Sequence, residues 1–204
     1  MTLSEFDNEI RKDHNVVCGC DEAGRGPLAG DVFAAAVIFD KDTVIEGIND
    51  SKKLTAKKRE ELFDEIMEKA VDFSIQTATV EEIEDINILN AAMLAMKRAV
   101  EDMDTKSDVC LIDGNKTPEG LECPAIAVVK GDAKSQAVAA ASILAKVARD
   151  RYMEQMAEQY PEYRFEKHKG YGTKLHYQMI DQYGPCGIHR MSFLKKYYAK
   201  KNGH

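Results

Sequence analysis

Short apolar segments rich in β-branched residues alternate with longer amphipathic segments along the chain. Residues 16–20 and 32–39 are two apolar runs separated by a glycine-rich turn, a pattern that predicts neighbouring antiparallel strands. A third strand is predicted at residues 73–80. Residues 109–112 and 125–129 are continuously apolar, which is typical of central strands covered by helices on both faces.

The segments between and after these strands show helical periodicity. Behind Thr55, a candidate N-cap, apolar side chains recur at helical spacing and predict a helix; they are Leu62, Phe63, Ile66, Met67 and Ala70. Residues 92–103 predict a second helix. A long third helix is predicted at residues 135–156, where many alanines would allow a close approach to a sheet. Two short helices follow, at residues 175–183 and 192–200.

This order of elements predicts an α/β fold in which helices flank a mixed β-sheet and a small helical subdomain lies at the C-terminal end. The length of 204 residues suits one domain better than two. We therefore expect residues 1–157 to form the core and residues 158–204 to form the helical subdomain, as parts of a single domain.

Composition places the chain among globular proteins. Apolar residues make up 44% of it and charged residues 31%, which excludes a disordered chain. The longest apolar run, residues 32–39, falls far short of the ~20 residues that a membrane-spanning helix needs. The polar, acidic start of the sequence differs from a secretory signal, so we expect a cytoplasmic protein. Five cysteines, an odd number, favour reduced thiols.

The net charge of −7 argues against indiscriminate binding to nucleic acid or to an anionic membrane, but it allows a local basic groove. Lysine and arginine side chains gather at residues 52–59, 167–169 and 195–201. We expect a phosphate-binding site at one of these clusters, although each is also typical of a solvated surface.

Acidic residues follow three of the predicted strands. Asp21 and Glu22 close the first strand, Asp113 ends the fourth, and Asp132 follows the fifth. If these strand ends converge on one edge of the sheet, four carboxylates meet there. An oxygen-only ligand set of this kind suits magnesium or manganese ions.

Each of these acidic residues also has a simpler interpretation. Asp132 is a candidate N-cap of the long alanine-rich helix, and Asp113 is a candidate turn residue. Asp21 and Glu22 point to opposite faces of a regular strand, which would leave one of them on the surface. A shared metal site explains all four positions with one cause.

Six motifs in the chain resemble those of ribonuclease HII, the type 2 ribonuclease H family. They are Asp-Glu-Ala-Gly-Arg-Gly-Pro at 21–27, Asp-Ser-Lys-Lys-Leu at 50–54, Ile-Asp-Gly-Asn at 112–115, Lys-Gly-Asp at 130–132, Ala-Ala-Ser-Ile-Leu-Ala-Lys-Val at 140–147 and His-Lys-Gly-Tyr at 168–171. The resemblance implies a ribonuclease H-like fold and cleavage of RNA in RNA:DNA hybrids. It also implies incision 5′ of single ribonucleotides embedded in duplex DNA, leaving a 3′-hydroxyl and a 5′-phosphate.

The resemblance assigns expected roles to individual residues. The catalytic residues, which would also bind two divalent metal ions, Mn²⁺ or Mg²⁺, are Asp21, Glu22, Asp113 and Asp132. The expected substrate-binding residues are Gly24, Arg25, Gly26, Ser51, Lys52, Lys146, His168 and Tyr171, and the subdomain at 158–204 is expected to bind substrate as well. Glycines allow close approach of a backbone to a ligand, so residues 24–26 are expected to contact the 2′-hydroxyl of a ribonucleotide. His168 and His189 are candidates either for proton transfer or for a binding or structural role.

Several alternatives stay open at this point. The related ribonuclease HIII type usually carries an extra N-terminal domain, whereas only about fifteen residues precede the first predicted strand here. A catalytically silent hybrid-binding protein would lack at least one of the acidic ligands, and all are present. Residues 191–198 faintly resemble a sliding-clamp-binding peptide but lack the expected glutamine at Met191, and a helix packed on the core explains their spacing as well. We expect a monomer whose partners are RNA:DNA hybrids and ribonucleotide-containing duplexes.

Overall fold

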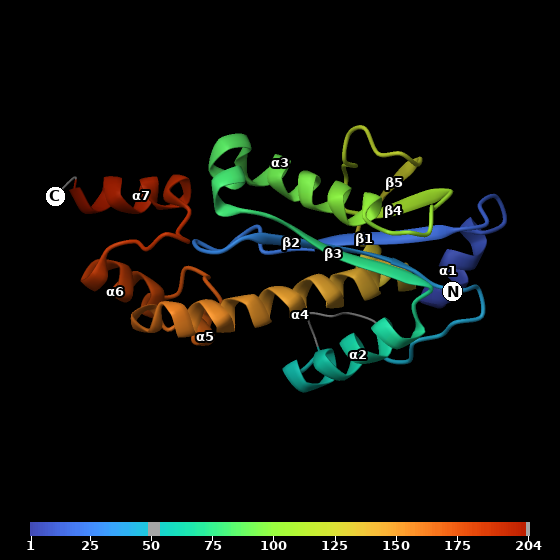
Figure 1. The fold of residues 1–204 in the computed structure, drawn as a ribbon, viewed down its shortest axis with the longest axis horizontal. Helices are drawn as coiled ribbons and strands as arrows, with labels where there is room; N and C mark the ends of the chain where they lie inside the picture. Colours follow the sequence, from blue (N-terminus) through green and yellow to red (C-terminus); the bar gives the residue numbers. More distant parts are fainter. Residues whose placement is uncertain (49–53, 203–204) are drawn as a thin grey trace.

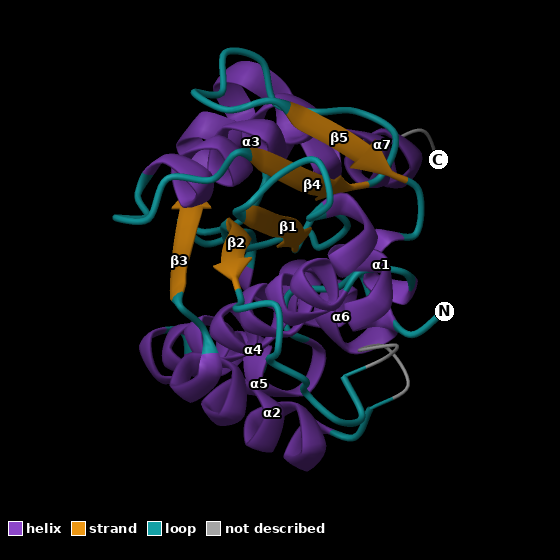
Figure 2. Cartoon of the chain, turned by 90° about the vertical axis from the view of Figure 1, so that its right-hand side faces the viewer, coloured by secondary structure: helices purple, strands orange, loops and turns teal. Residues whose placement is uncertain are grey.

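A computed structural model describes residues 1–48 and 54–202. Five strands form one mixed sheet in the order β3-β2-β1-β4-β5 (Figure 2). The strands are β1 (Val17–Ala23), β2 (Val32–Ile38), β3 (Asp72–Ala78), β4 (Val109–Asp113) and β5 (Ala125–Val128). Strand β2 is antiparallel to both β1 and β3, whereas β1, β4 and β5 run parallel, so their carboxyl ends lie at the same edge of the sheet. The predicted mixed sheet is confirmed.

Helices cover both faces of this sheet (Figure 1). The chain contains α1 (Leu3–Ile10), α2 (Ala56–Lys69), α3 (Val80–Glu101), α4 (Gln136–Gln159), α5 (Phe165–His168), α6 (Lys174–Tyr183) and α7 (Met191–Asn202), with 3-10 turns η1 (Gly131–Ala133) and η2 (Pro161–Tyr163). On β2, Ala34 and Ala36 face α3, whereas Ala35 and Val37 face α2 and α4. This alternation gives the three layers, and α5, α6 and α7 extend beyond one end of the sheet (Figure 1).

Helix α4 lies unusually close to strand β1 because Gly19 has no side chain. A Cβ added at Gly19 would lie 2.2 Å from the carbonyl carbon of Ala137 and 2.3 Å from the nitrogen of Val138. Alanines at the α4 surface complete the close contact, as the alanine-rich sequence predicts. Because α4 also carries Ser142 and Lys146, the contact at Gly19 sets how far these side chains lie from the end of β1.

We therefore expect Gly19→Ala to destabilise the fold by about 3 kcal/mol or more, since backbone atoms of α4 cannot move aside as a flexible side chain would. Urea unfolding measures this loss. Gly26→Ala is the matched control, because its added Cβ would make only an ordinary 3.7 Å contact. A Gly19→Ala variant that unfolds within 1 kcal/mol of the wild type, on the order of a surface substitution, would contradict the expected packing.

Three expectations from the sequence are wrong in detail. The segment at 125–129 is not a central strand, because β5 lies at the sheet edge and Ile126 is 40% exposed. Helix α3 begins at Val80, capped by Thr79, so strand β3 ends earlier than expected and the helix begins well before residue 92. The N-cap of α4 is Ser135, whose hydroxyl accepts a hydrogen bond from the Val138 N–H, and not Asp132.

The sequence held a local signal for the start of α3 and for one helix that was not predicted. Thr79 and Glu82 form a capping box at the start of α3, and Thr2 and Glu5 form another at α1, a helix that was not predicted. The positive φ of Asn87 interrupts α3, which shifts the phase of its apolar residues and obscures the periodicity of its first turns. The edge position of β5 had no local signal.

The C-terminal helices pack against the glycine-rich loop that follows β1. Leu28 packs with Ile180 of α6 and Leu194 of α7. Ala29 packs with Met153 of α4 and Phe165 of α5. Residues 24–30 are thereby held between the end of the sheet and the helices of residues 158–204.

No helix in the described part of the chain is both long and apolar enough to cross a membrane. The five cysteines, all within the described residues, are free thiols, as expected.

Candidate active site

The carboxyl ends of the parallel strands bring three acidic positions to one edge of the sheet. Cys20 of β1 pairs with Ile112 of β4, so Asp21 and Asp113 follow at the same level on adjacent strands. Asp113 pairs in turn with Val128, the last residue of β5. Asp132 lies in η1, shortly after that strand, and is half-buried. The convergence expected from the sequence is therefore found at the level of the backbone.

Asp21 is the buried member of this group, with an exposed fraction of 6%. One of its carboxylate oxygens, Oδ1, accepts a hydrogen bond of 2.7 Å from the Glu22 N–H, and the Ser142 hydroxyl of α4 donates another to the carboxylate. Burial raises the pKa of Asp21 well above its usual range, and the negative charges of Glu22 and Asp113 raise it further. The site therefore holds more negative charge than its protein surroundings balance.

The other carboxylates are held by neighbouring groups. Glu22 Oε1 lies 3.1 Å from Arg25 Nη1 in an ion pair. Asp113 Oδ1 accepts a short hydrogen bond of 2.6 Å from the Gly131 N–H. Because Gly131 immediately precedes Asp132, this bond ties the fourth acidic residue to the end of β4.

These side chains fit a divalent metal ion by their chemistry. All the candidate metal ligands are carboxylate oxygens, which Mg²⁺ and Mn²⁺ prefer. A cation would also balance the negative charge around Asp21. Within residues 1–48 and 54–202, no three acidic, histidine or cysteine side chains already surround a common point where an ion would lie. Binding would therefore require rotation of side chains that now contact Arg25 and Gly131.

The loop at Gly24–Gly26 lies beside Tyr171, although the two are far apart in the sequence. Gly24 has a φ of +103°, and a Cβ there would overlap Arg149 Nε at 2.2 Å, so only glycine fits. Gly26 faces the ring of Tyr171, since a Cβ added at Gly26 would lie 3.7 Å from Cε1 of that ring. Tyr171 is 43% exposed. The structure thus brings together two segments for which the sequence predicted substrate binding separately.

Two buried arginines hold this arrangement, and neither was predicted from the sequence. Arg149 of α4 and Arg190 before α7 are 1% and 0% exposed. Arg149 donates hydrogen bonds to the carbonyls of Asp31, Lys169 and Ala29, which join the loop after β1 to the loop that carries Tyr171. Arg149 lies beside Asp150 and Arg151 in a charged part of α4, so no local signal set it apart from a surface arginine.

His168 has a structural role in this loop. Its Nδ1 accepts a hydrogen bond from the Gly170 N–H, and its Nε2 lies 2.9 Å from the Tyr163 carbonyl, to which it donates. Both ring nitrogens are therefore occupied inside the protein. The geometry supports the structural interpretation of His168 over proton transfer.

His189 and His176 form a chain of hydrogen bonds that ends at Tyr171. The Cys186 N–H donates to His189 Nδ1, so the neutral His189 ring carries its proton on Nε2. That nitrogen lies 3.0 Å from His176 Nε2, and His176 Nδ1 lies 3.0 Å from the Tyr171 carbonyl. When both rings are neutral, each of these nitrogens has a suitable hydrogen-bond partner. A proton added to His176 would place its Nε2–H group against the Nε2–H group of His189.

We expect this histidine pair to make stability depend on pH. Burial lowers the pKa of His176 and of His189 to about 4, from an ordinary value of 6.5. Because the folded-state pKa is depressed, the stabilisation is fully present above pH 6.5 and is lost as the pH falls through about 4. The loss should reach roughly 3 kcal/mol for one histidine.

Thermal unfolding between pH 7 and pH 4 measures this effect in the wild type and in His176→Gln. The variant should be less stable at pH 7 and should lose less stability on acidification. His14→Gln, which removes a histidine from the other end of the chain, is the control. Parallel pH curves for His176→Gln and the wild type would contradict the expectation.

Of the predicted phosphate-binding residues, Ser51 and Lys52 lie outside the described residues. Lys146 lies on α4 one turn after Ser142, and its ammonium group is 2.6 Å from the carboxylate of Asp150. Its phosphate-binding role stays a prediction, in which a phosphate would replace Asp150 as the partner.

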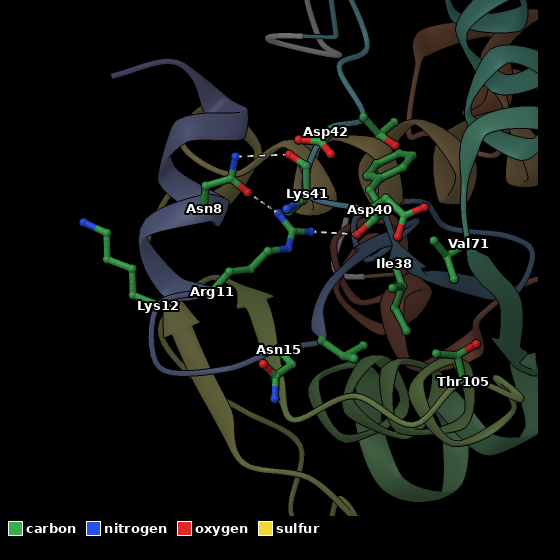
Figure 3. A pocket seen from close by; sticks show the side chains of 13 residues that line it. Asn8, Arg11, Lys12, Asn15, Ile38, Asp40, Lys41, Asp42, Val71 and Thr105 are labelled. Atoms are coloured by element: carbon green, nitrogen blue, oxygen red, sulfur yellow. Dashed lines mark hydrogen bonds between the residues drawn. The ribbon is translucent and has the colours of Figure 1, made fainter.

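A pocket of 820 Å³ lies away from the carboxylates (Figure 3). It is formed where α1 ends, β1 begins and β2 ends, and its lining includes Asn8, Arg11, Asp40 and Thr105. Arg11 spans it by donating to the Asn8 side chain and to the Phe39 carbonyl. Its position at the opposite end of β1 from Asp21 separates it from the acidic site.

Residues of α7 pack on the C-terminal helices, which explains the spacing that resembled a clamp-binding peptide. Leu194 is fully buried, and the ring centroid of Tyr197 lies 4.5 Å from that of Tyr177 on α6. Met191 is 46% exposed. Clamp binding by this segment stays a prediction.

Comparison with protein families gives a match that spans most of the chain. The family model described as Ribonuclease HII matches residues 18–196. The ribonuclease HII of Caldicellulosiruptor saccharolyticus is 54% identical over 189 residues, which cover 93% of this chain and 92% of that protein. The ribonuclease HII of Idiomarina loihiensis is 58% identical over 178 residues, covering 87% of this chain and 95% of that protein.

Solved structures agree with this match. The ribonuclease H2 of Pyrococcus horikoshii superposes with a TM-score of 0.72 at 29% identity, covering 87% of this chain and 93% of that chain. The Archaeoglobus fulgidus ribonuclease HII, solved in complex with PCNA, gives a TM-score of 0.68 at 25% identity and covers 86% of this chain and 94% of that chain.

Proposed function

Because the chain belongs to the ribonuclease HII family, and is therefore an endoribonuclease that acts on RNA:DNA hybrids, we propose that it also incises duplex DNA 5′ of single embedded ribonucleotides. The observation that carries the proposal is the position of the Gly24–Gly26 loop, which directly follows Asp21 and Glu22 and lies against Tyr171. Groups suited to recognise one ribose thus lie next to the carboxylates.

The proposed catalytic residues are Asp21, Glu22, Asp113 and Asp132, which would hold divalent metal ions, Mg²⁺ or Mn²⁺. Ions bound at these residues would supply activation of a water molecule for attack on phosphorus and charge stabilisation of the departing 3′ oxygen. Ser142 would keep Asp21 oriented through its hydroxyl hydrogen bond. The expected products are a 3′-hydroxyl on the upstream DNA and a 5′-phosphate on the ribonucleotide.

The remaining residues near the site would bind and orient the duplex. Gly26 has no side chain that would keep a ribose away from its backbone groups, and Gly24 leaves room for Arg149 behind the loop, so the loop can contact the 2′-hydroxyl. Arg25 is half-exposed and can exchange its ion pair with Glu22 for a phosphate contact. Lys146 and the helices of residues 158–204 extend the contact along the duplex. The carboxylates themselves would repel a phosphate backbone, so these groups and the metal ions are needed to bring it in.

The test is incubation of the protein with a duplex that carries one ribonucleotide, with an all-DNA duplex of the same sequence, and with a continuous RNA:DNA hybrid. Cleavage on the 5′ side of the single ribonucleotide in Mg²⁺ or Mn²⁺, its loss in EDTA and an intact all-DNA duplex support the proposal. Extension of the upstream fragment by a DNA polymerase detects the 3′-hydroxyl. Cleavage of the hybrid alone would restrict the function to hybrids and overturn the proposal.

A further inference from the structure

The side chain of Arg190 is fully buried and reaches into the loop that follows β1. Its Nη2 donates to the Gly24 carbonyl at 2.7 Å and to the Gly30 carbonyl at 2.6 Å. Its Nη1 donates to the carbonyls of Pro27 at 2.9 Å and Arg25 at 3.2 Å, and its Nε bonds Gly30 at 2.9 Å. One guanidinium thus gathers four carbonyl groups from residues 24–30.

We infer that Arg190 is a positioning residue that holds the backbone of residues 24–30 in the conformation that contacts a ribose. The inference rests on the proposed function and adds a residue from the far end of the sequence to the recognition of the ribonucleotide. Arg190 lies behind the loop and would touch neither the substrate nor the metal ions.

The geometry explains why the position requires arginine. A guanidinium presents five N–H donors in a rigid planar fork, whereas a lysine ammonium presents three donors from a single atom. A lysine at position 190 would keep the positive charge but could not reach carbonyls as far apart along the loop as those of Gly24, Pro27 and Gly30. The substitution Arg190→Lys therefore removes the geometry of the five donors while keeping the positive charge.

The hydrogen bonds also determine which groups of the loop face outward. Because Arg190 binds the carbonyls of Gly24 and Arg25 from inside, these oxygens are not the groups offered to a ligand. The main-chain hydrogen bonds of turns, loops and helix caps in the described residues include none that the N–H groups of Arg25 or Gly26 donate. These N–H groups are suited to donate to an oxygen of the substrate, such as a 2′-hydroxyl.

A loop held in this way avoids the entropy cost of ordering when substrate binds. Gly24, with its φ of +103°, is flexible in an unfolded chain and would stay mobile without an internal partner. The loop is also joined to the rest of the protein at residues 28–30, where the Leu28 N–H donates to Gly170, the Gly30 N–H donates to Ile188 and Arg149 donates to the Ala29 carbonyl. The hydrogen bonds of Arg190 differ from these in reaching Gly24 and Arg25, which follow Glu22 closely in the sequence.

The experiment compares recognition of a ribonucleotide with general duplex binding. The KM for a duplex with one ribonucleotide is measured together with the Ki of the identical all-DNA duplex as a competitor, for the wild type and for Arg190→Lys. We expect the KM to rise about tenfold or more and the Ki to stay within about twofold of the wild-type value, because only the KM includes contacts to the 2′-hydroxyl.

A control and a second variant make the result specific. Ile66→Val removes a buried methylene between α2 and α4, away from the loop, and should lower the melting temperature without changing the ratio of Ki to KM. Arg190→Gln, which keeps two donors and removes the buried charge, serves as a second variant of the same position. Its KM should rise as in the lysine variant.

The possible outcomes separate the inference from the function on which it rests. A wild-type protein that does not cut at the single ribonucleotide overturns the proposed function. A wild type that cuts, with a ratio of Ki to KM unchanged in a folded Arg190 variant, overturns the inference alone. Equal rises in KM and Ki, or failure of both Arg190 variants to fold, would assign Arg190 to general stability and overturn it too.

Discussion

Asp21→Asn is expected to lower the cleavage rate by about three orders of magnitude or more while leaving the fold intact. In the proposed mechanism the reaction depends on metal ions held by these carboxylates, so losing one ligand charge should remove several kcal/mol of transition-state stabilisation. In the absence of metal the variant should be more thermally stable than the wild type. Burial and the charges of Glu22 and Asp113 raise the pKa of Asp21, so a neutral side chain removes an unfavourable ionised group.

The same loss of activity is expected for Asp113→Asn and Asp132→Asn, measured as initial rates with the single-ribonucleotide duplex in saturating Mg²⁺ or Mn²⁺. Asp102→Asn is a matched control, because it also removes one carboxylate charge, from a residue that binds Ser74 and Gln76 on β3. Near wild-type turnover in a folded Asp21, Asp113 or Asp132 variant would remove that residue from the proposed site.

Tyr171→Ala is expected to lose about tenfold to a hundredfold more activity on a duplex with one ribonucleotide than on a continuous hybrid. Stacking of a base or sugar on an aromatic ring contributes on the order of 1–3 kcal/mol. The ring of Tyr171 is 43% exposed and faces Gly26, so it can contact the sugar next to the one recognised by the loop. In the single-ribonucleotide duplex that sugar is a deoxyribose, and an additional hydroxyl would crowd the ring.

The measurement is the ratio of kcat/KM for the two substrates, determined with one preparation and one metal. Tyr183→Ala is the matched control, since Tyr183 is 51% exposed on α6 and its removal should leave the ratio unchanged. Tyr171→Phe should keep the ratio if the flat ring carries the discrimination. Equal losses on both substrates in Tyr171→Ala would leave Tyr171 as a structural residue and assign the recognition to residues 24–26.

The local sequence was sufficient to find most secondary structure and the acidic positions. The long helix α4 and its alanines, the Thr55 cap of α2 and the adjacent strands β1 and β2 all follow from periodicity and capping, which are properties of neighbouring residues. Asp21 and Asp113 were identifiable because each comes directly after a run of apolar residues. The capping boxes at Thr2 and Thr79 were equally local and could have been used.

Contacts between distant segments needed the tertiary structure. Whether Val128 ends a central or an edge strand depends on which strands pair beside it, and the same apolar residues suit either position. No local pattern around Arg190 reveals that its partners are the carbonyls of residues 24–30, because a backbone carbonyl has the same chemistry in every residue. The neutral chain from His189 through His176 to Tyr171 likewise exists only once three segments are packed together.

The sequence by itself thus determined most of the helices and strands and which acidic side chains are candidates for binding metal ions, since these depend on residue type and local spacing. The tertiary structure decided how those groups are held: the parallel register that puts Asp21 beside Asp113, the close approach of α4 at Gly19, and the buried Arg190 behind Gly24. The physical reason is that register and helix packing are set by the burial of whole faces, to which residues far apart in the sequence contribute together.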